Sequence, residues 1–287
     1  MDPLFPPFQP QSPDPRRGWG RRAIPFRVLI PNVITLLALC AGMSAIRLAI
    51  ENKLDLAIGC IVVAALLDGI DGRVARYLKG TSKFGAELDS LADFVNFGVV
   101  PGIVLYFWGL HDLRSLGWIG SLVFAICMVL RLARFNVTSA EPNRPPFQAN
   151  FFTGMPAPAG ACTVLLPIYL SFLGLTHEPS HAMFELAYVL LIAFLMISTI
   201  PTFSGKKLGT RIPREWVLPI FVVAVVVVLL LAFNPWETLT AITLIYLATI
   251  PFGVVYYRRQ ARAWQFAQEQ AAGKPSPQGG EGGAANQ

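Results

Sequence analysis

Four aspartates, Asp68, Asp71, Asp89 and Asp93, stand close together in the sequence at spacings that could build one metal site. On a helix, Asp68 and Asp71 occupy positions i and i+3, and Asp89 and Asp93 occupy i and i+4, so each pair shares one helix face. The intervening residues 77–84 include glycine, threonine, serine and two lysines, which is typical of a short turn. Two antiparallel helices joined by this turn would direct all four carboxylates toward one point.

The chemistry open to such a cluster is metal-assisted transfer of a phosphoryl group. Carboxylate oxygens are hard ligands that suit Mg²⁺ or Mn²⁺. Four carboxylates can bridge two ions about 3.5–4 Å apart, which is the arrangement that clamps a phosphoryl group during in-line displacement. A second interpretation is a network of ion pairs with nearby Lys and Arg at a membrane surface, but such a network does not require this spacing.

Small and basic residues around the aspartates favour the first interpretation. Gly72, Ala75 and Gly85 leave room for a large ligand or for close helix packing. Arg76 can bind phosphate oxygens through two parallel N–H groups, which a lysine cannot do. Ser82, in the predicted turn, could donate a hydrogen bond to the same phosphate group.

The aspartates are flanked by apolar stretches that predict a membrane protein. Hydrophobic residues make up 54% of the 287 residues and charged residues only 14%, against about 25% in soluble domains. We therefore expect an all-α polytopic membrane helix bundle. A carboxylate within a membrane span costs roughly 2.5–3.5 kcal/mol or more, so the cluster is expected to have a chemical function.

Eight apolar stretches are long enough to cross a bilayer. Proline residues 156, 158 and 167 interrupt the fifth of them. The tails, residues 1–23 and 263–287, are rich in Pro, Gly, Gln, Ser and Ala and are predicted to be disordered. The eight stretches are 29–50, 54–78, 86–109, 117–136, 155–174, 182–203, 216–233 and 236–257.

The distribution of basic residues predicts the orientation. An even number of spans places both termini on one side, and that side receives most of the Arg and Lys residues outside the spans. The positive-inside rule makes this the cytoplasmic side, so the aspartate cluster is expected to face the cytoplasm. The net charge of +6 fits contact with anionic lipid headgroups, and nucleic acid is not needed to explain it.

The cysteines and histidines are not expected to take part in the chemistry. The four cysteines fall within apolar stretches, without the spacing of a zinc site or a disulfide framework, and are predicted to be small core residues. His111, His177 and His181 fall in predicted non-cytoplasmic loops, and we interpret them as solvated. A metal site at the spacing of His177 and His181 is disfavoured because Glu178 and Pro179 interrupt the helical pattern.

The complete string Asp68-x2-Asp71-Gly72-x2-Ala75-Arg76-x8-Gly85-x3-Asp89-x3-Asp93 resembles the signature of the CDP-alcohol phosphotransferase family. The resemblance covers about residues 24–205, the expected catalytic membrane domain, and leaves 206–262 as two further transmembrane helices. It implies two divalent cations, Mg²⁺ or Mn²⁺, with Asp68 and Asp89 bridging both, Asp71 binding one and Asp93 the other. It also implies that Asp93 is the base for the acceptor alcohol and that the protein is a homodimer. The residues implied to contact CDP-diacylglycerol are Pro31, Asn32, Gly72, Arg76, Ser82 and Gly85.

The identity of the acceptor alcohol has to be inferred from residues outside this signature. Segments 30–35, 131–136 and 152–158 resemble the bacterial and archaeal phosphatidylserine synthase branch, although Met155 replaces an expected leucine. This branch implies L-serine as acceptor, in a bacterial inner membrane. A serine carboxylate needs a buried cation, and the candidates for the acceptor pocket are Arg131, Arg134 and Asn136. These arginines could instead anchor the spans or bind lipid phosphate.

Other functions stay open at this stage. Glycerol 3-phosphate or inositol phosphate would favour a more basic pocket, for which Lys206, Lys207 and Arg211 are available. None of the histidines is followed by lysine two residues later, so we expect direct attack rather than a phosphohistidine intermediate. A cation-coupled transporter would also place acids in a membrane, but the sequence shows no internal repeat. A structural scaffold would leave the acids unexplained.

Overall fold

The computed structural model of the chain describes residues 26–139, 151–203 and 214–272, and these residues are almost entirely helical. Each of the eight predicted apolar stretches contains helix. The long helices are α1 (Phe26–Ile50), α2 (Leu54–Tyr77), α3 (Lys83–Phe94), α4 (Val100–Trp108), α5 (Ser115–Ser139), α8 (Ala182–Ile197), α9 (Arg214–Phe233) and α10 (Pro235–Ala272).

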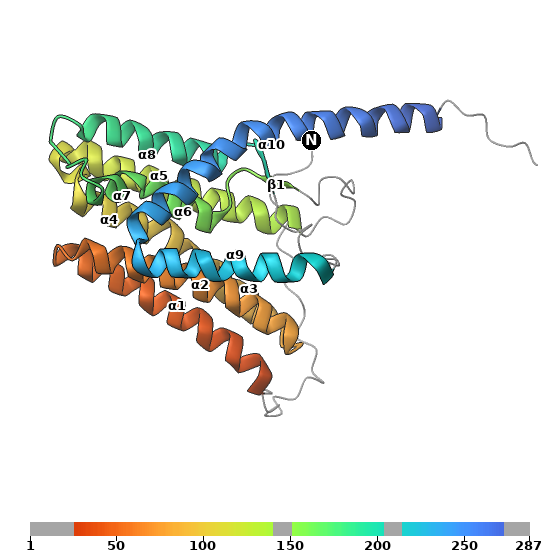
Figure 1. Ribbon diagram of the computed structural model, residues 1–287, viewed down its shortest axis with the longest axis horizontal. Coiled ribbons are helices and arrows are strands. Elements are labelled where there is room, and N and C mark those ends of the chain that lie inside the picture. Colours follow the sequence, from red (N-terminus) through yellow and green to blue (C-terminus); the bar gives the residue numbers. More distant parts are fainter. Residues whose placement is uncertain (1–25, 140–150, 204–213, 273–287) are drawn as a thin grey trace, which may run out of the picture.

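Helices α1, α2 and α3 lie together on one side of the molecule, and α5 and α8 lie on the other, with α4 between them (Figure 1). Helix α2 ends in a tight turn, in which Lys79 has a φ of 50° and the Gly80 N–H donates to the Ala75 carbonyl at 2.9 Å. Ser82 then begins α3 as its N-cap, because its hydroxyl accepts a hydrogen bond from the Gly85 N–H at 3.0 Å. The predicted turn between the two aspartate pairs is therefore confirmed.

Between α3 and α4 the helix widens into one π-helical turn, η1 (Val95–Val99). The Val100 N–H donates to the Val95 carbonyl, five residues back, and Pro101 has no N–H to continue the α-helical pattern. Asn96, in this turn, is only 2% exposed and lies against Gly42 of α1. The sequence analysis did not predict this turn, although Pro101 was a signal for it.

The fifth predicted stretch forms two short helices, α6 (Ala157–Val164) and α7 (Leu166–Phe172). The break falls at Leu165, directly before a helix that begins with Pro167 in its first turn, as expected for a residue that lacks an N–H. A small two-stranded antiparallel sheet, β1 (Phe151–Thr153) and β2 (Pro201–Phe203), departs from the all-α prediction. It joins the chain before α6 to the chain after α8.

Helix α10 crosses the bundle near α6 and α7 and continues far beyond it (Figure 1). It extends to Ala272, although the sequence predicts that disorder begins at residue 263. Helix α9 contacts α10, and most of its side chains are exposed.

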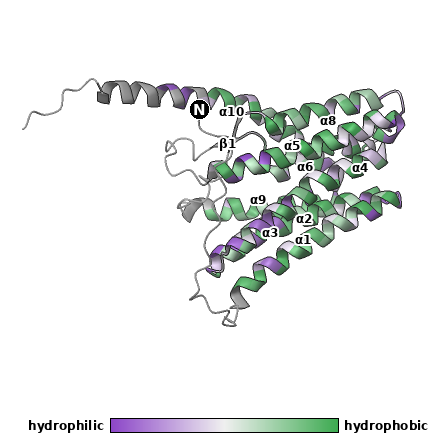
Figure 2. Cartoon of the chain, turned by 180° about the vertical axis from the view of Figure 1, so that it is seen from behind, coloured by the Kyte–Doolittle hydropathy of each residue, from purple (hydrophilic) through white to green (hydrophobic). Residues whose placement is uncertain are grey.

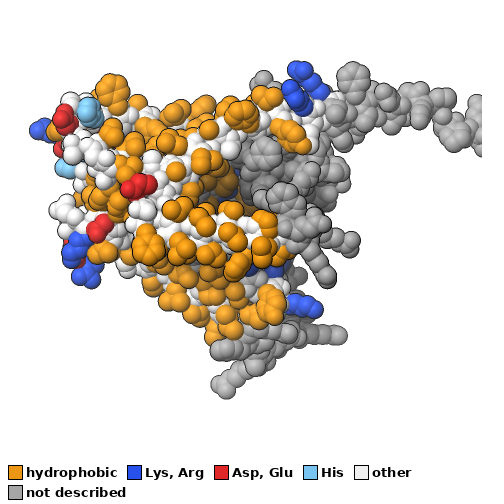
Figure 3. Space-filling model, in the orientation of Figure 1, with side chains coloured by type: hydrophobic (Ala, Val, Ile, Leu, Met, Phe, Trp, Pro, Cys, Tyr) orange, Lys and Arg blue, Asp and Glu red, His pale blue; other side chains and the backbone are white. Residues whose placement is uncertain are grey.

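The molecule has the surface of a membrane protein. Hydrophobic residues cover most of the helices, and hydrophilic residues gather on α3 and toward the ends of the bundle (Figures 2 and 3). Among the described residues, helices long and apolar enough to cross a membrane span Val28–Ile50, Lys83–Trp108, Ser115–Thr138 and Pro235–Tyr257. Helices α8 and α9 are also apolar, but their apolar segments, Ala182–Ile197 and Val217–Phe233, are shorter. Helix α2 is long enough but carries five charged residues. The chain is thus a polytopic helical membrane protein.

Two expectations about single residue types were wrong. Cys40 is exposed on α1 rather than part of the core, although Cys60, Cys127 and Cys162 are partly buried. His177 is not solvated, because its side chain is only 16% exposed and bridges two carboxylates. Its Nδ1 lies 2.9 Å from Glu185 Oε1 and its Nε2 lies 3.0 Å from Asp112 Oδ2.

These hydrogen bonds set the charge of His177. Burial is the largest single influence and disfavours the protonated ring, but the hydrogen bonds and negative charges of Glu185 and Asp112 together outweigh it. The pKa of His177 therefore rises above its ordinary value of 6.5. The protonated ring can donate to both carboxylates at once. It therefore ties α8 to the short helix η2 (Leu110–Leu113), which connects α4 to α5.

Candidate active site

The predicted carboxylate cluster forms where α2 and α3 face each other. Asp68, Asp71 and Asp89 each present a carboxylate oxygen, and these oxygens lie within 4.8 Å of one another. Asp71 is only 3% exposed. The i, i+3 spacing on α2 and the antiparallel course of α3 bring these groups together, as the sequence analysis predicted.

The fourth aspartate lies beside the other three. Asp93 interacts with Asp68 and Asp89 and also with the positive charge of Arg131 on α5. Its Oδ1 is buried and accepts no hydrogen bond from any described residue. Arg131 is only 7% exposed, so the charge of a buried guanidinium acts on the partly buried Asp93 carboxylate.

Thr35 of α1 is a site residue that the sequence analysis did not single out. Its Oγ1 lies 2.6 Å from Asp71 Oδ2 and 3.1 Å from the Pro31 carbonyl oxygen. Thr35 is 5% exposed, so the contact with Asp71 is shielded from solvent. The residue belongs to segment 30–35, which attracted attention only through its resemblance to a family.

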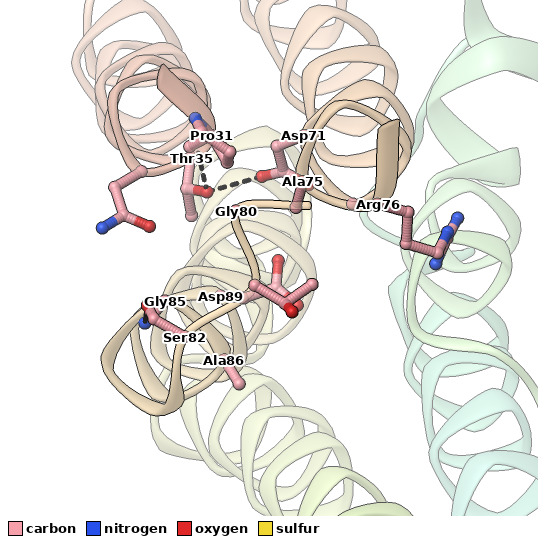
Figure 4. Close-up of a pocket in the computed structure, with 13 residues that line it drawn as sticks. Pro31, Thr35, Asp71, Ala75, Arg76, Gly80, Ser82, Gly85, Ala86 and Asp89 are labelled. Atoms are coloured by element: carbon pink, nitrogen blue, oxygen red, sulfur yellow. Dashed lines mark hydrogen bonds between the residues drawn. The ribbon is translucent and has the colours of Figure 1, made fainter. Parts of the chain in front are cut away.

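A pocket of about 280 Å³ opens next to Asp71 and Asp89. Figure 4 shows these two carboxylates and Thr35 facing the space between α1, α2 and α3, while the Arg76 side chain points away from them. All six residues predicted to contact CDP-diacylglycerol line this pocket, together with Thr81 and Ala86. They are Pro31, Asn32, Gly72, Arg76, Ser82 and Gly85.

Two of these six pocket residues, Gly72 and Gly85, are glycines, and the lack of a side chain has a different effect at each. A Cβ at Gly85 would lie 2.8 Å from Asn32 Oδ1, so the absence of a side chain lets α1 approach the first turn of α3. A Cβ at Gly72 would meet no atom within 4 Å. Gly72 therefore leaves open volume in the pocket itself, which suits a ligand that approaches the backbone of α2.

The three candidates for the acceptor pocket lie in different surroundings. Arg134 donates from its Nη1 to the Ile197 carbonyl at 2.6 Å and from its Nη2 to the Ser198 carbonyl at 2.9 Å. These bonds hold its guanidinium against the carboxyl end of α8. Asn136 donates to the Ser90 hydroxyl of α3 at 3.1 Å. Arg131 is the candidate whose charge acts on Asp93.

The alternative basic residues proposed for a phosphate-bearing acceptor, Lys206, Lys207 and Arg211, lie outside the described residues. The expected acceptor segment at 152–158 begins in β1. Gly154 follows that strand with a φ of 79°, a left-handed conformation that favours glycine. Its N–H donates to the Ile200 carbonyl at 2.9 Å, which fixes this segment to the chain that follows α8.

The residues fit a site for divalent cations. Carboxylates from two helices converge within a few ångströms, and an acceptor oxygen of Asp93 is buried without a donor among the described residues. Burying several carboxylates together is unfavourable unless cations neutralise them. Arg131 alone supplies too little positive charge for four acids.

Comparison with known proteins bears on what this site does. Residues 28–196 match the profile of the CDP-alcohol phosphatidyltransferase family. The chain belongs to this family. Residues 215–251 match a second profile, described as CDP-alcohol phosphatidyltransferase 2, which extends the family likeness to α9 and most of the membrane part of α10.

Individual members of the CDP-alcohol phosphatidyltransferase family resemble the chain over most of its length. A CDP-diacylglycerol–serine O-phosphatidyltransferase of Mycobacterium leprae is 42% identical over 83% of this chain and 78% of the relative. The protein of the same name from Helicobacter pylori is 34% identical, over 76% and 88%. That of Methanocaldococcus jannaschii is 34% identical, over 62% and 77%.

Proposed function

We propose that this protein transfers the phosphatidyl group of CDP-diacylglycerol to L-serine, giving phosphatidylserine and CMP. The observation that carries the proposal is the cluster of Asp68, Asp71 and Asp89 beside a pocket lined by the six residues expected to contact the nucleotide. The names of the similar relatives support serine as the acceptor. A buried arginine next to Asp93 suits an acceptor with a carboxylate.

Different residues would act on the nucleotide and on the acceptor alcohol. The pocket holds the CDP part, and Asp93 accepts the proton of the serine hydroxyl, since a neutral hydroxyl is a poor nucleophile. The serine oxygen forms a bond to the phosphorus that carries diacylglycerol, and the bond from that phosphorus to CMP breaks. Arg131 pairs with the serine carboxylate. No covalent enzyme intermediate is formed.

The four aspartates would hold two divalent cations, Mg²⁺ or Mn²⁺. When bound, such ions supply neutralising charge to the diphosphate and to the departing CMP. Asp68, Asp71, Asp89 and Asp93 would supply the carboxylate ligands to these ions. Thr35 holds the Asp71 carboxylate by its hydrogen bond.

The arrangement in the membrane is also a proposal. Eight spans, with both termini and the aspartates on the cytoplasmic side, agree with the distribution of basic residues. Residues 24–205 would form the catalytic domain and 206–262 two further spans, with a tail at 1–23 and with 263–287 beyond the spans, where residues up to Ala272 continue α10. We also propose that the protein is a homodimer in a bacterial inner membrane.

The test is CMP release by purified full-length protein in detergent, with CDP-diacylglycerol, Mg²⁺ or Mn²⁺ and one alcohol at a time. We expect release with L-serine, and its loss when EDTA is added. Asp93→Asn should lower kcat by about 100-fold or more, because a general base contributes that much. Asp55→Asn, an exposed position at the start of α2, is the matched control and should retain activity.

Two outcomes would contradict the proposal in different ways. Release only with glycerol 3-phosphate or inositol phosphate would keep the aspartate site and reject serine. Release that survives Asp93→Asn would keep the reaction and reject the assigned base.

A further inference from the structure

A second cluster of titratable side chains lies at the end of the bundle where α4 is connected to α5 and α7 to α8, far from the turn between α2 and α3 (Figure 1). It contains His111 and Asp112 of η2, His177 in the loop between α7 and α8, and Glu185 in the first turn of α8. Histidine and acidic side chains are seen together at this end of the molecule (Figure 3). The proposed reaction uses none of these residues.

Two imidazole rings contact the Asp112 carboxylate, one at each oxygen. His177 Nε2 lies 3.0 Å from Asp112 Oδ2, and His111 Nε2 lies 3.5 Å from Asp112 Oδ1. In a tetrahedral zinc site each nitrogen or oxygen ligand is about 2.0–2.2 Å from the ion, so neighbouring ligand atoms lie about 3.3–3.6 Å apart. The two contacts with Asp112 are therefore close to the separation between ligands of one ion.

The other nitrogen of each ring faces a hydrogen-bond acceptor. His177 Nδ1 lies 2.9 Å from Glu185 Oε1, and His111 Nδ1 lies 3.3 Å from the Tyr106 carbonyl oxygen. With the ring proton on Nδ1, each Nε2 presents a lone pair to the Asp112 carboxylate, and that contact is unfavourable unless a cation lies between the two groups. Metal-binding histidines have this arrangement, because their second nitrogen donates to a carboxylate or a backbone carbonyl.

The backbone and the neighbouring rings hold two of these groups in place. The Trp108 and His177 rings are in contact, with their centroids 4.9 Å apart, and a Cβ at Gly109 would lie 2.8 Å from His177 Cε1. The Asp112 N–H donates to the Gly109 carbonyl at 3.2 Å. The His111 side chain is 52% exposed, so it is the group with room to adjust to an ion.

We propose that Asp112, His177 and His111 bind one Zn²⁺ ion, with Glu185 orienting the His177 ring. Two imidazole nitrogens and one carboxylate suit Zn²⁺ and leave a fourth position for water, whereas Mg²⁺ prefers oxygen ligands. The ion replaces the proton that His177 otherwise holds on Nε2, and its two positive charges offset those of Asp112 and Glu185. Zinc then joins η2 to the loop before α8. This site is separate from the aspartate cluster and does not depend on the proposed function.

The experiment is a calorimetric titration of Zn²⁺ into metal-free, tag-free, full-length protein in detergent, at constant pH and with Mg²⁺ in excess. We expect wild type to bind Zn²⁺ through this site. His111→Gln changes an exposed side chain and should fold like wild type, but its affinity for Zn²⁺ should be lower by about tenfold or more, since even the loss of a group that only orients a ligand costs that much. His177→Gln should show a similar loss.

His181→Gln is the matched control, because His181 is exposed and lies in the same loop as His177. Its affinity for Zn²⁺ should equal that of wild type. Zn²⁺ should also raise the Tm of wild type and of His181→Gln but not that of His111→Gln, because a ligand stabilises the folded state that binds it.

Three results would overturn the proposal. They are the absence of Zn²⁺ binding by wild type, an unchanged affinity in His111→Gln, and an equal loss in His181→Gln. Zinc bound at the aspartates would give the second result. Neither readout depends on CMP release, so a failure of this proposal is distinguishable from a failure of the proposed function.

Discussion

At the scale of single residues, the hydrogen bond between Thr35 and Asp71 links α1 to the carboxylate cluster. The Thr35 hydroxyl has one hydrogen but two acceptors within reach, the Asp71 carboxylate at 2.6 Å and the Pro31 carbonyl at 3.1 Å. The second contact is the ordinary one for a threonine inside a helix. The shorter contact orients a carboxylate that is 3% exposed, and groups that orient metal ligands strongly affect affinity and activity.

Replacing Thr35 by valine should therefore weaken the site without changing its volume. We expect Thr35→Val to lower activity, or to raise the Mg²⁺ or Mn²⁺ concentration needed for half-maximal activity, by roughly tenfold or more. Thr35→Ser keeps the hydroxyl and should stay close to wild type. Titration of the metal in the CMP-release assay measures the effect, and equal behaviour of the two variants would mean that the hydroxyl has no role.

The residue scale also shows what could be predicted from sequence. The convergence of Asp68, Asp71 and Asp89 follows from helix periodicity and a short turn, which are local properties. The surroundings of Arg131 and Arg134 could not be predicted in this way. The two arginines stand three residues apart on one helix, yet Arg134 donates to carbonyls at the end of α8 and Arg131 lies beside Asp93. Only the packing of distant helices distinguishes them.

At the scale of elements, the π-helical turn after Asp93 depends on close packing against α1. A Cβ at Gly42 would overlap the side-chain oxygen of Asn96, which is 2% exposed and has little room to move. Asn96 stands three residues after Asp93 on the same continuous helix. A displacement of this turn would therefore also move Asp93, the assigned base.

We expect Gly42→Ala to destabilise the protein by about 1–3 kcal/mol, the usual result of overpacking, and to lower activity. Gly59→Ala is its control, because a Cβ at Gly59 would meet no atom within 4 Å and alanine is the better helix former by about 1 kcal/mol. Thermal unfolding in detergent should give a lower Tm for the first variant and an unchanged or higher Tm for the second. The opposite order would mean that α1 can move away from Asn96 freely.

Sequence patterns predicted the helical elements better than their irregularities. Apolar stretches of sufficient length located the helices, and Pro167 marked the break between α6 and α7. The π-helical turn and the sheet of β1 and β2 were not predicted. The turn depends on contacts with α1, and the sheet pairs segments that are about 50 residues apart, so neither has a local periodicity.

At the scale of the whole molecule, His177 connects two parts of the bundle at the end opposite the aspartates. Its ring bridges Asp112 of η2 and Glu185 of α8, and His111 lies 3.5 Å from the other oxygen of Asp112. The pKa of His177 is raised in the folded state, so its contribution to stability is complete below about 6.5 and is lost as the pH rises through the higher folded-state pKa.

The Tm of the wild type should therefore fall by a few degrees as the pH rises from about 6.5 through the raised pKa of His177. His177→Gln should have a lower Tm at pH 6 and a flatter dependence on pH. The matched control is His181→Gln, since His181 is exposed and its loss should leave the profile unchanged. A parallel fall in the wild type and in His177→Gln would assign the pH dependence to other groups.

Helix α10 extends as a rigid element beyond the membrane-crossing part of the bundle. Its membrane-crossing part ends at Tyr257, but the same helix continues to Ala272 without interruption. At 1.5 Å per residue this continuation is roughly 22 Å long, and it projects past the bundle as a stiff rod (Figure 1). This part of α10 thus lies outside the bundle, and no described residue of it lines the nucleotide pocket.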